Sequence, residues 1–223
     1  MKREVDFNEI SDGKLYGLND MVKADCGDCK GCFACCQGMG QSVILDPLDC
    51  FRLTKNLSCT IETLLADKLE LNVVDGIVLP NLRMSGEEER CGFLNGEGRC
   101  SIHRFRPGIC RLFPLGRVYE EQGFQYFLQT QECRMETRTK VKVRKWIDTS
   151  DIRQYEKFVL DWHFFLKYLE QQLDQNKDPA FANKVSMYVL KNFYLVPYNY
   201  EEDFYSQFEK RLENKRLEAS TFL

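Results

Sequence analysis

Residues 29–36 read CKGCFACC, so this short stretch places cysteines at positions 29, 32, 35 and 36. A cysteine at every third residue allows one tight loop to turn several thiolates toward a common centre, where they can bind a metal ion or a cluster. Cysteines at this spacing also occur in bacterial ferredoxins, in which one loop supplies ligands of an iron–sulfur cluster. The stretch therefore predicts a half of the protein that is organised around metal-binding cysteines.

Further cysteines follow this loop after a gap, and they are Cys91, Cys100, Cys110 and Cys133. Ligands from a distant segment can complete a coordination shell when the chain folds. Because side chains of consecutive residues tend to point apart, we expect one of Cys35 and Cys36 to serve a second site or a partner ligand. No cysteine follows Cys133, so the chemistry is expected in the first part of the chain.

The composition indicates a packed globular protein. Of the 223 residues, 43% are hydrophobic and 16 are Phe, which is enough apolar side chain for a sizeable core. The net charge of −3 gives no reason to expect nucleic acid or an acidic membrane surface as the main partner. The N-terminus has no apolar run after its basic pair, and no segment has the roughly 18 uninterrupted apolar residues of a membrane helix. We therefore expect a soluble cytoplasmic protein without a membrane partner.

The use of cysteine favours metal ligands over disulfides. In a reducing compartment, clustered cysteines are more often ligands than bridges, and the odd total of 11 does not fit a fully bridged framework. Cys26 extends the spacing of three, and we interpret it as a loop cysteine. Cys50 and Cys59 lie in predicted helical segments, where we expect small buried apolar residues.

Short elements joined by turns are expected before residue 150. Asp46-Pro47 predicts a helix start, because Asp caps free amides and Pro is preorganised at the first helical position. A short strand is expected over 43–45, a second helix over 61–69 and an edge strand over 139–144. Hairpins are predicted from 71–74 with 77–79, within 91–100 and from 115–119 with 124–128. The hairpin within 91–100 would bring Cys91 and Cys100 close together.

After residue 150 the apolar residues adopt the period of helices. One long amphipathic helix is indicated by Ile152, Tyr155, Val159, Trp162, Leu166, Leu169 and Leu173. Asp178-Pro179 predicts the start of another helix, and Phe204, Phe208 and Leu212 indicate a last one. We therefore predict an α+β protein. A cysteine-rich metal-binding region over 1–149 is followed by a helical region over 150–223, which we expect to pack on it as one structural unit.

A second signature surrounds Cys110, where residues 100–114 read CSIHRFRPGICRLFP. Together with the CxxCxxCC loop, this stretch resembles the CxxCxxCC family of zinc- or iron-chelating proteins over about 29–133. The resemblance implies that the metal ligands are Cys29, Cys32, Cys35, Cys36, Cys91, Cys100, Cys110 and Cys133. A related branch contains flagellin lysine N-methylases, for which an iron–sulfur cluster and S-adenosylmethionine are implied. This chain has no Rossmann-type methyl-donor loop, so we do not carry that activity over.

Two metals fit this cysteine set. Eight cysteines are enough for two closed tetrahedral zinc sites, but zinc knuckles usually come as two separated C-x2-C pairs. The run of three cysteines at successive intervals of three instead favours an iron–sulfur cluster, expected as [4Fe–4S], with zinc as the alternative.

His103, Arg106 and Arg111 are the candidate residues beside the metal. His103 lies between two expected ligands, and a structural or supporting role is favoured over ligation because eight thiolates are already present. Arg106 and Arg111 flank Cys110, where they would neutralise thiolate charge or grip an anionic substrate or cofactor. His163 lies in the aromatic helix and is interpreted as a core or boundary residue.

Two functional hypotheses follow, from different classes, and a metal-storage or delivery protein with labile, exchangeable metal is a third. In the first, the metal takes part in redox or methyl-transfer chemistry, with an unidentified protein or small molecule as partner. In the second, zinc stabilises an interaction module without catalysis, with closed sites and an exposed apolar surface on the helices. The sequence contains no phosphate-binding loop and no arrangement typical of a hydrolase, and it does not decide whether the protein is an enzyme.

Overall fold

The computed structural model describes residues 7–27, 29, 32–135 and 137–222. Before residue 150 the elements are short, and they are α1 (Phe7–Ile10), β1 (Met21–Asp25), η1 (Ala34–Cys36), α2 (Pro47–Leu57), α3 (Ile61–Asp67), β2 (Leu69–Val74), β3 (Ile77–Leu82), β4 (Met84–Ser85), β5 (Arg90–Cys91), η2 (His103–Phe105), α4 (Gly108–Leu112), β6 (Leu115–Glu120), β7 (Gly123–Leu128), β8 (Thr139–Lys142) and α5 (Val143–Ile147). Long helices follow as α6 (Ile152–Gln175), α7 (Pro179–Leu190), the π-helical turn η3 (Lys191–Leu195) and α8 (Phe204–Phe222). The protein is thus of mixed α and β structure, as predicted.

The strands of the described chain form two-stranded antiparallel sheets. β2 pairs with β3 across a turn at Asp75-Gly76, where both residues have a positive φ of 49° and 85°. This conformation suits a two-residue hairpin turn and is easy for Gly. β6 pairs with β7 in the same way. Both hairpins were predicted from the sequence.

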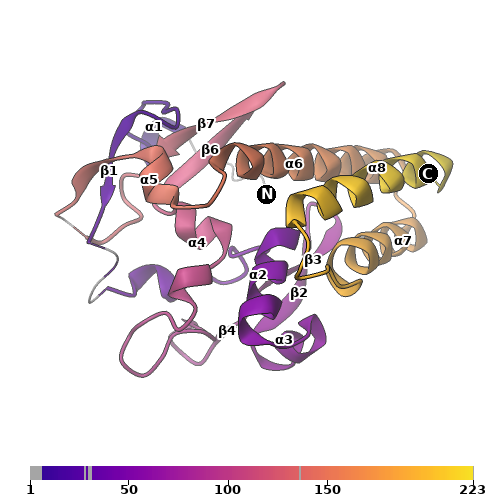
Figure 1. Cartoon of the computed structure of the whole chain (residues 1–223), viewed down its shortest axis with the longest axis horizontal. Helices are drawn as coiled ribbons and strands as arrows, with labels where there is room; N and C mark the ends of the chain where they lie inside the picture. The colour runs from indigo at the N-terminus through magenta and orange to yellow at the C-terminus, as the bar shows by residue number, and fades with distance from the viewer. Residues whose placement is uncertain (1–6, 28, 30–31, 136, 223) are drawn as a thin grey trace.

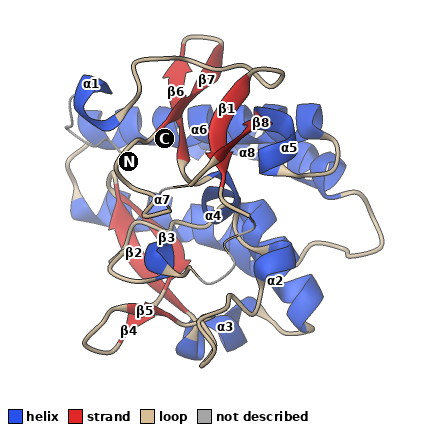
Figure 2. Ribbon diagram, turned by 90° about the vertical axis from the view of Figure 1, so that its left-hand side faces the viewer, coloured by secondary structure: helices blue, strands red, loops and turns tan. Residues whose placement is uncertain are grey.

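The remaining sheets join segments that are distant in sequence or that flank a loop. β1 pairs with β8, with Val22 opposite Val141, and so brings the chain near residue 25 to the chain near residue 139. β4 pairs with β5, and Met84 lies opposite Cys91. Figure 2 shows β1 and β8 beside the β6–β7 hairpin, and the β2–β3 and β4–β5 hairpins at the other end of the molecule.

The helix α2 begins where the sequence predicts it. The Asp46 side chain accepts a hydrogen bond from Asp49 N (2.8 Å), and the Asp49 side chain accepts one from Asp46 N (3.2 Å), with Pro47 at the first helical position. This capping box satisfies amides that have no partner within the helix. Both carboxylates are thereby held at the inner end of α2.

The long helices lie together at one side of the molecule (Figure 1), and their apolar faces join the core of the cysteine-rich half. The α6 residues Phe158, Trp162 and Phe165 are buried among aromatic side chains of η3 and α8. Hydrogen bonds cross between the two halves: Tyr194 donates to Leu45 O (2.9 Å), and Ser186 Oγ accepts from Val78 N (3.0 Å). The core is therefore continuous across residue 150.

Three predicted elements differ from the structure. Residues 43–45 make only the single bridge of Ile44 to Asn81, because the α2 cap begins directly after them. The predicted strand over 139–144 ends at Lys142, because Val143 starts α5. Within 91–100, only Leu94 and Cys100 form a bridge, because Cys91 pairs with β4 instead.

Among the residues that the structure describes, no helix combines the length and the apolar composition needed to cross a membrane.

Candidate metal centre

Seven of the eight expected ligand cysteines line one cavity of about 560 Å³. The expected ligands that line it are Cys29, Cys32, Cys35, Cys36, Cys91, Cys100 and Cys110, whereas Cys133 is outside the lining. All eleven cysteines lie in the described part of the chain, and all are free thiols. The fold therefore brings seven of the eight expected ligands to one cavity, and no disulfide joins them.

Short elements position one subset, which we call the inner cysteine group: Cys35, Cys36, Cys91, Cys100 and Cys110. Cys35 and Cys36 lie on η1, Cys91 ends β5, and Cys110 lies in α4. The Leu94–Cys100 bridge places Cys100 opposite the loop that follows Cys91. Turns and two-residue strands, rather than one continuous sheet, thus bring these thiols together.

The thiols of the inner cysteine group lie close enough to influence one another. Burial raises the pKa of Cys110, and the neighbouring Cys91, Cys35 and Cys100 raise it further. The neighbouring Cys36 thiol lowers the pKa of Cys35 to about 7. Both residues lie on a 3₁₀ turn, in which successive side chains are about 120° apart rather than opposed as in a strand. That one of them serves a second site stays a prediction.

A second subset, which we call the outer cysteine group, consists of Cys26, Cys29, Cys32 and Cys133. The Sγ atoms of Cys26 and Cys29 are 3.6 Å apart. Burial, followed by the charge of Cys26, raises the pKa of Cys29 to about 12. Burial also raises the pKa of Cys133, to which Cys26 and Cys32 add. Cys26, which the sequence left outside the expected ligand set, is thus in direct contact with Cys29, one of the expected ligands.

The donor chemistry fits a thiophilic metal. Thiolates bind zinc and iron–sulfur clusters strongly, and both cysteine groups contain at least four of them. Among the described residues, no three His, Cys, Asp or Glu side chains lie close enough together to hold an ion as they stand.

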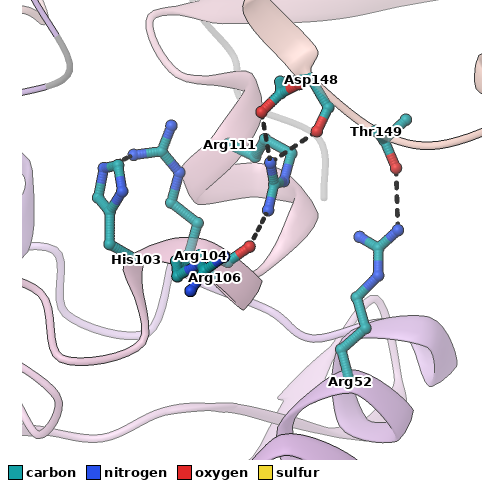
Figure 3. Close-up of polar contacts among 7 residues, drawn as sticks. All are labelled: Arg52, His103, Arg104, Arg106, Arg111, Asp148 and Thr149. Atoms are coloured by element: carbon teal, nitrogen blue, oxygen red, sulfur yellow. Dashed lines mark hydrogen bonds and ion pairs between the residues drawn. The ribbon is translucent and has the colours of Figure 1, made fainter.

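Arg106 and His103 line the cavity next to these thiols. Arg106 Nη1 donates a hydrogen bond to Nε2 of His103, which orients both side chains (Figure 3). The guanidinium of Arg106 also lowers the pKa values of Cys29, Cys35 and Cys100 relative to their values without it. Arg106 therefore supplies positive charge that favours thiolates on both cysteine groups.

Arg111 lies elsewhere. Its guanidinium donates to the backbone carbonyls of Asp148 and Arg104, each at 2.8 Å, and its side chain is outside the cavity lining (Figure 3). Nearby, Arg52 Nη2 donates to Thr149 Oγ1 (2.9 Å). The geometry thus assigns Arg111 to fastening α4 to the segment after α5.

Arg117 is a cavity residue that sequence analysis missed. It lies on β6, and its Nη2 donates to Tyr155 Oη (3.0 Å) while its buried Nε has no hydrogen-bond partner. Tyr119, Tyr155 and Asp49 line the same region. The sign in the sequence that could have pointed to Arg117 is its place inside the apolar strand pattern LGRVYE. Local sequence does not reveal which buried elements its side chain meets.

Asp49 lies in the same region of the cavity. Its carboxyl accepts a hydrogen bond from Gly108 N (2.7 Å) and is 2% exposed. Burial, followed by the charge of Asp46, raises the pKa of Asp49.

The other residues singled out from the sequence have structural positions. Cys50 is buried in α2, as predicted. Cys59 is half-buried and lies between α2 and α3, not in a helix, because Ser58 ends α2 and Thr60 caps α3. His163 stacks on Tyr119 with ring centroids 3.6 Å apart, and burial lowers its pKa to about 4. This position matches the boundary residue that was expected.

The site defines a cysteine-rich metal-binding protein. The model of the CxxCxxCC family, described as a putative zinc- or iron-chelating domain, matches residues 28–146. The chain belongs to this family. Comparison with curated proteins gave no match, and comparison with solved structures gave none either.

Proposed function

We propose that this protein binds an iron–sulfur cluster, expected as [4Fe–4S], through cysteines of the expected ligand set, among them the run Cys29, Cys32 and Cys35, and that the adjoining cavity receives a small anionic molecule. The observation that carries the proposal is that thiols and the arginines Arg106 and Arg117 line one continuous cavity. Zinc is the alternative metal. The cytoplasm is the proposed location, because a reducing compartment keeps clustered thiols free.

The size of the cavity supports a bound ligand in addition to a metal. A water molecule occupies about 30 Å³ of liquid, and small-molecule sites commonly measure roughly 300–1,000 Å³. The cavity of about 560 Å³ falls in this range. A closed structural zinc site needs no such space, because protein ligands fill its whole shell.

The charge distribution supports an anionic ligand. Arg106 influences the pKa values of several cysteines, whereas Arg117 influences those of Asp46, Tyr119 and Tyr155. Arg117 thus acts on a different set of cavity residues from Arg106. Its guanidinium has an unpaired buried N–H and can donate to a carboxylate or phosphate in two-point geometry. A ligand held there would extend toward the metal.

The chain's own residues would bind and orient such a ligand. Tyr155 holds the guanidinium of Arg117 in place, and the buried wall around them limits access of water. When bound, an iron–sulfur cluster would supply electron transfer or an open iron for redox or methyl-transfer chemistry, whereas zinc would supply a Lewis acid.

A zinc-stabilised interaction module is the second candidate, and it has its own support. Val73 on β2 is 69% exposed and Met187 on α7 is 60% exposed. α7 packs on β3, which pairs with β2, so the elements that carry these two side chains are neighbours. Exposed apolar side chains that lie together are typical of protein interaction surfaces.

Visible absorption of protein purified without oxygen tests the proposal directly. A broad band that bleaches with dithionite, together with iron and acid-labile sulfide, would support the iron–sulfur cluster. A colourless protein that contains zinc would favour the interaction module. Absence of any metal after purification without chelator and reconstitution would refute metal binding. Thermal shifts with acetate, succinate and phosphate then test the cavity, with Arg117→Met expected to abolish any stabilisation by these anions.

A further inference from the structure

The β2–β3 hairpin has one edge that other segments cover. Along the far edge of β3, every second residue is hydrogen-bonded to another part of the chain: Val78 N donates to Ser186 Oγ (3.0 Å), Pro80 O accepts from Leu45 N (2.9 Å), and Leu82 N donates to Val43 O (3.0 Å). These bonds show that residues 78, 80 and 82 turn their backbone groups away from β2.

The register of the hairpin determines what the other edge presents. Leu71 lies opposite Pro80, and Val73 lies opposite Val78. In an antiparallel pair, two opposite residues turn their N–H and C=O groups either toward each other or both away from each other. Since Val78 and Pro80 face away, Leu71 and Val73 present their backbone groups on the outer edge of β2. In the part of the chain that the structure describes, no hydrogen bond from another segment reaches these groups.

The side chains along this outer edge are apolar and exposed. Leu71 is 44% exposed and Val73 is 69% exposed. Natural proteins usually guard an open edge with a charged side chain, a proline or a bulge. β2 contains no proline and pairs with β3 without a bulge, and the carboxylate of Glu70 accepts hydrogen bonds from Asn72 Nδ2 (3.0 Å) and Asn81 Nδ2 (3.1 Å). This edge is therefore suited to pair with a further strand.

A second copy of β2 matches the edge. When two β2 strands run antiparallel about a two-fold axis at Asn72, Leu71 of one copy lies opposite Val73 of the other on both sides of the axis. Both residues turn their backbone groups outward, so each such pair exchanges both of its hydrogen bonds. The exposed apolar side chains then meet across the strands, which stabilises a sheet.

The charges at the ends of β2 favour the same arrangement. Lys68 directly precedes the strand, and Asp75 directly follows it. In the antiparallel pair, Lys68 of one copy lies beside Asp75 of the other at both ends, where unlike charges attract. An axis at Leu71 would instead set Asp67 opposite Asp75 of the second copy, and like charges in that position destabilise a sheet.

We propose that this protein forms a homodimer in which β2 pairs antiparallel with β2 of a second copy, about a two-fold axis at Asn72. The two hairpins then form one sheet across the interface, and Leu71 and Val73 lose their contact with water. No cysteine takes part in this interface, so the inference goes beyond the proposed metal binding and holds for a cluster and for zinc alike.

Sedimentation equilibrium of the full chain tests the dimer, in reducing buffer so that no disulfide joins the copies. The unmodified protein should change from monomer to dimer as its concentration rises. Val73→Pro removes an outward N–H that the hairpin itself does not use, so it should raise the Kd of the dimer by about tenfold or more. Val73→Ile is the matched control, because it keeps the N–H and the branched apolar side chain and should keep the dimer. A monomer at every concentration, or a dimer that Val73→Pro leaves intact, would overturn the inference.

Two further measurements do not depend on the proline variant. If circular dichroism shows that Val73→Pro does not fold, Val73→Lys replaces it, because lysine keeps the backbone and places a charge on the edge. Amide hydrogen exchange of the unmodified protein, followed by NMR at low and high concentration, should show protection of Leu71 and Val73 that rises with concentration. Asn72 is the internal control, because its N–H faces β3 and should be protected at both concentrations. Equal exchange of Leu71 and Val73 at both concentrations would refute pairing between copies.

Discussion

Removing the hydroxyl of Tyr194 should destabilise the whole protein, including the cysteine-rich half. Tyr194 lies on η3 and is 6% exposed, and its hydroxyl donates to Leu45 O at 2.9 Å. Leu45 is fully buried and directly precedes the cap of α2. Tyr194→Phe keeps the ring and leaves this carbonyl without its donor.

The expected cost follows from the burial of the carbonyl. Leaving a buried polar group without a partner costs about 1–3 kcal/mol. For a chain of this size, 1 kcal/mol corresponds to a change in Tm of about 2–4 °C, so a decrease of about 2–12 °C is expected. Because the core is continuous across residue 150, the variant should unfold in one transition at lower temperature.

Differential scanning calorimetry and urea unfolding would measure this effect, each with protein of the same metal content. Tyr168→Phe on α6 is the control, because its side chain is 36% exposed and its loss should change the free energy of unfolding by less than about 0.5 kcal/mol. An unchanged Tm for Tyr194→Phe, or two separate transitions, would show that the helices do not stabilise the cysteine-rich half through this contact.

Three further predictions concern other parts of the structure. Arg111→Leu leaves two backbone carbonyls without a donor, so urea unfolding should show that the free energy of unfolding decreases by about 2–4 kcal/mol. Arg104→Leu is the control, because the Arg104 side chain is exposed and its replacement should have little effect. Burial lowers the pKa of His163 to about 4, so the free energy of unfolding should fall as the pH decreases from 6.5 toward 4. In His163→Gln, the difference between the free energies of unfolding at pH 7 and pH 5 should be smaller than in the unmodified protein. Gly116→Ala places a Cβ 2.3 Å from a buried phenylalanine ring, so its Tm should decrease by an amount equivalent to about 1–3 kcal/mol, whereas Gly123→Ala meets no atom within 4 Å. Equal Tm values for the two alanine variants would contradict the packing described for the hairpin.

Much of the fold followed from local signals. The Asp46-Pro47 helix start, the Asp75-Gly76 hairpin and the helical period after residue 150 are set by residues within a few positions of each other. These features depend on backbone conformation and side-chain period, which a single sequence contains. The strand predicted over 139–144 was too long, because its end depends on pairing with β1, a distant segment.

The site was predictable only in part, because contacts between distant segments cannot be read from a local stretch of sequence. The cysteine spacing identified the thiols that line the cavity, since spacing is a local property. The contact of Cys26 with Cys29 and the position of Arg117 beside Tyr155 depend on how the elements pack. The 3₁₀ turn that carries Cys35 and Cys36 was also missed, because it is not marked by Gly or Pro.

The pairing of β1 with β8 has a consequence for synthesis of the protein. Asp25 and Thr139, which are hydrogen-bonded in this sheet, are 114 residues apart in the chain. At about 5–20 residues per second, a ribosome needs roughly 6–23 seconds to make the intervening segment. During this time the first cysteines emerge without their distant partners, and their thiols are open to oxidation or to the wrong metal. Correct metal loading should therefore depend on events after residue 139 has left the ribosome, so newly made protein would be most sensitive to oxidants before that point.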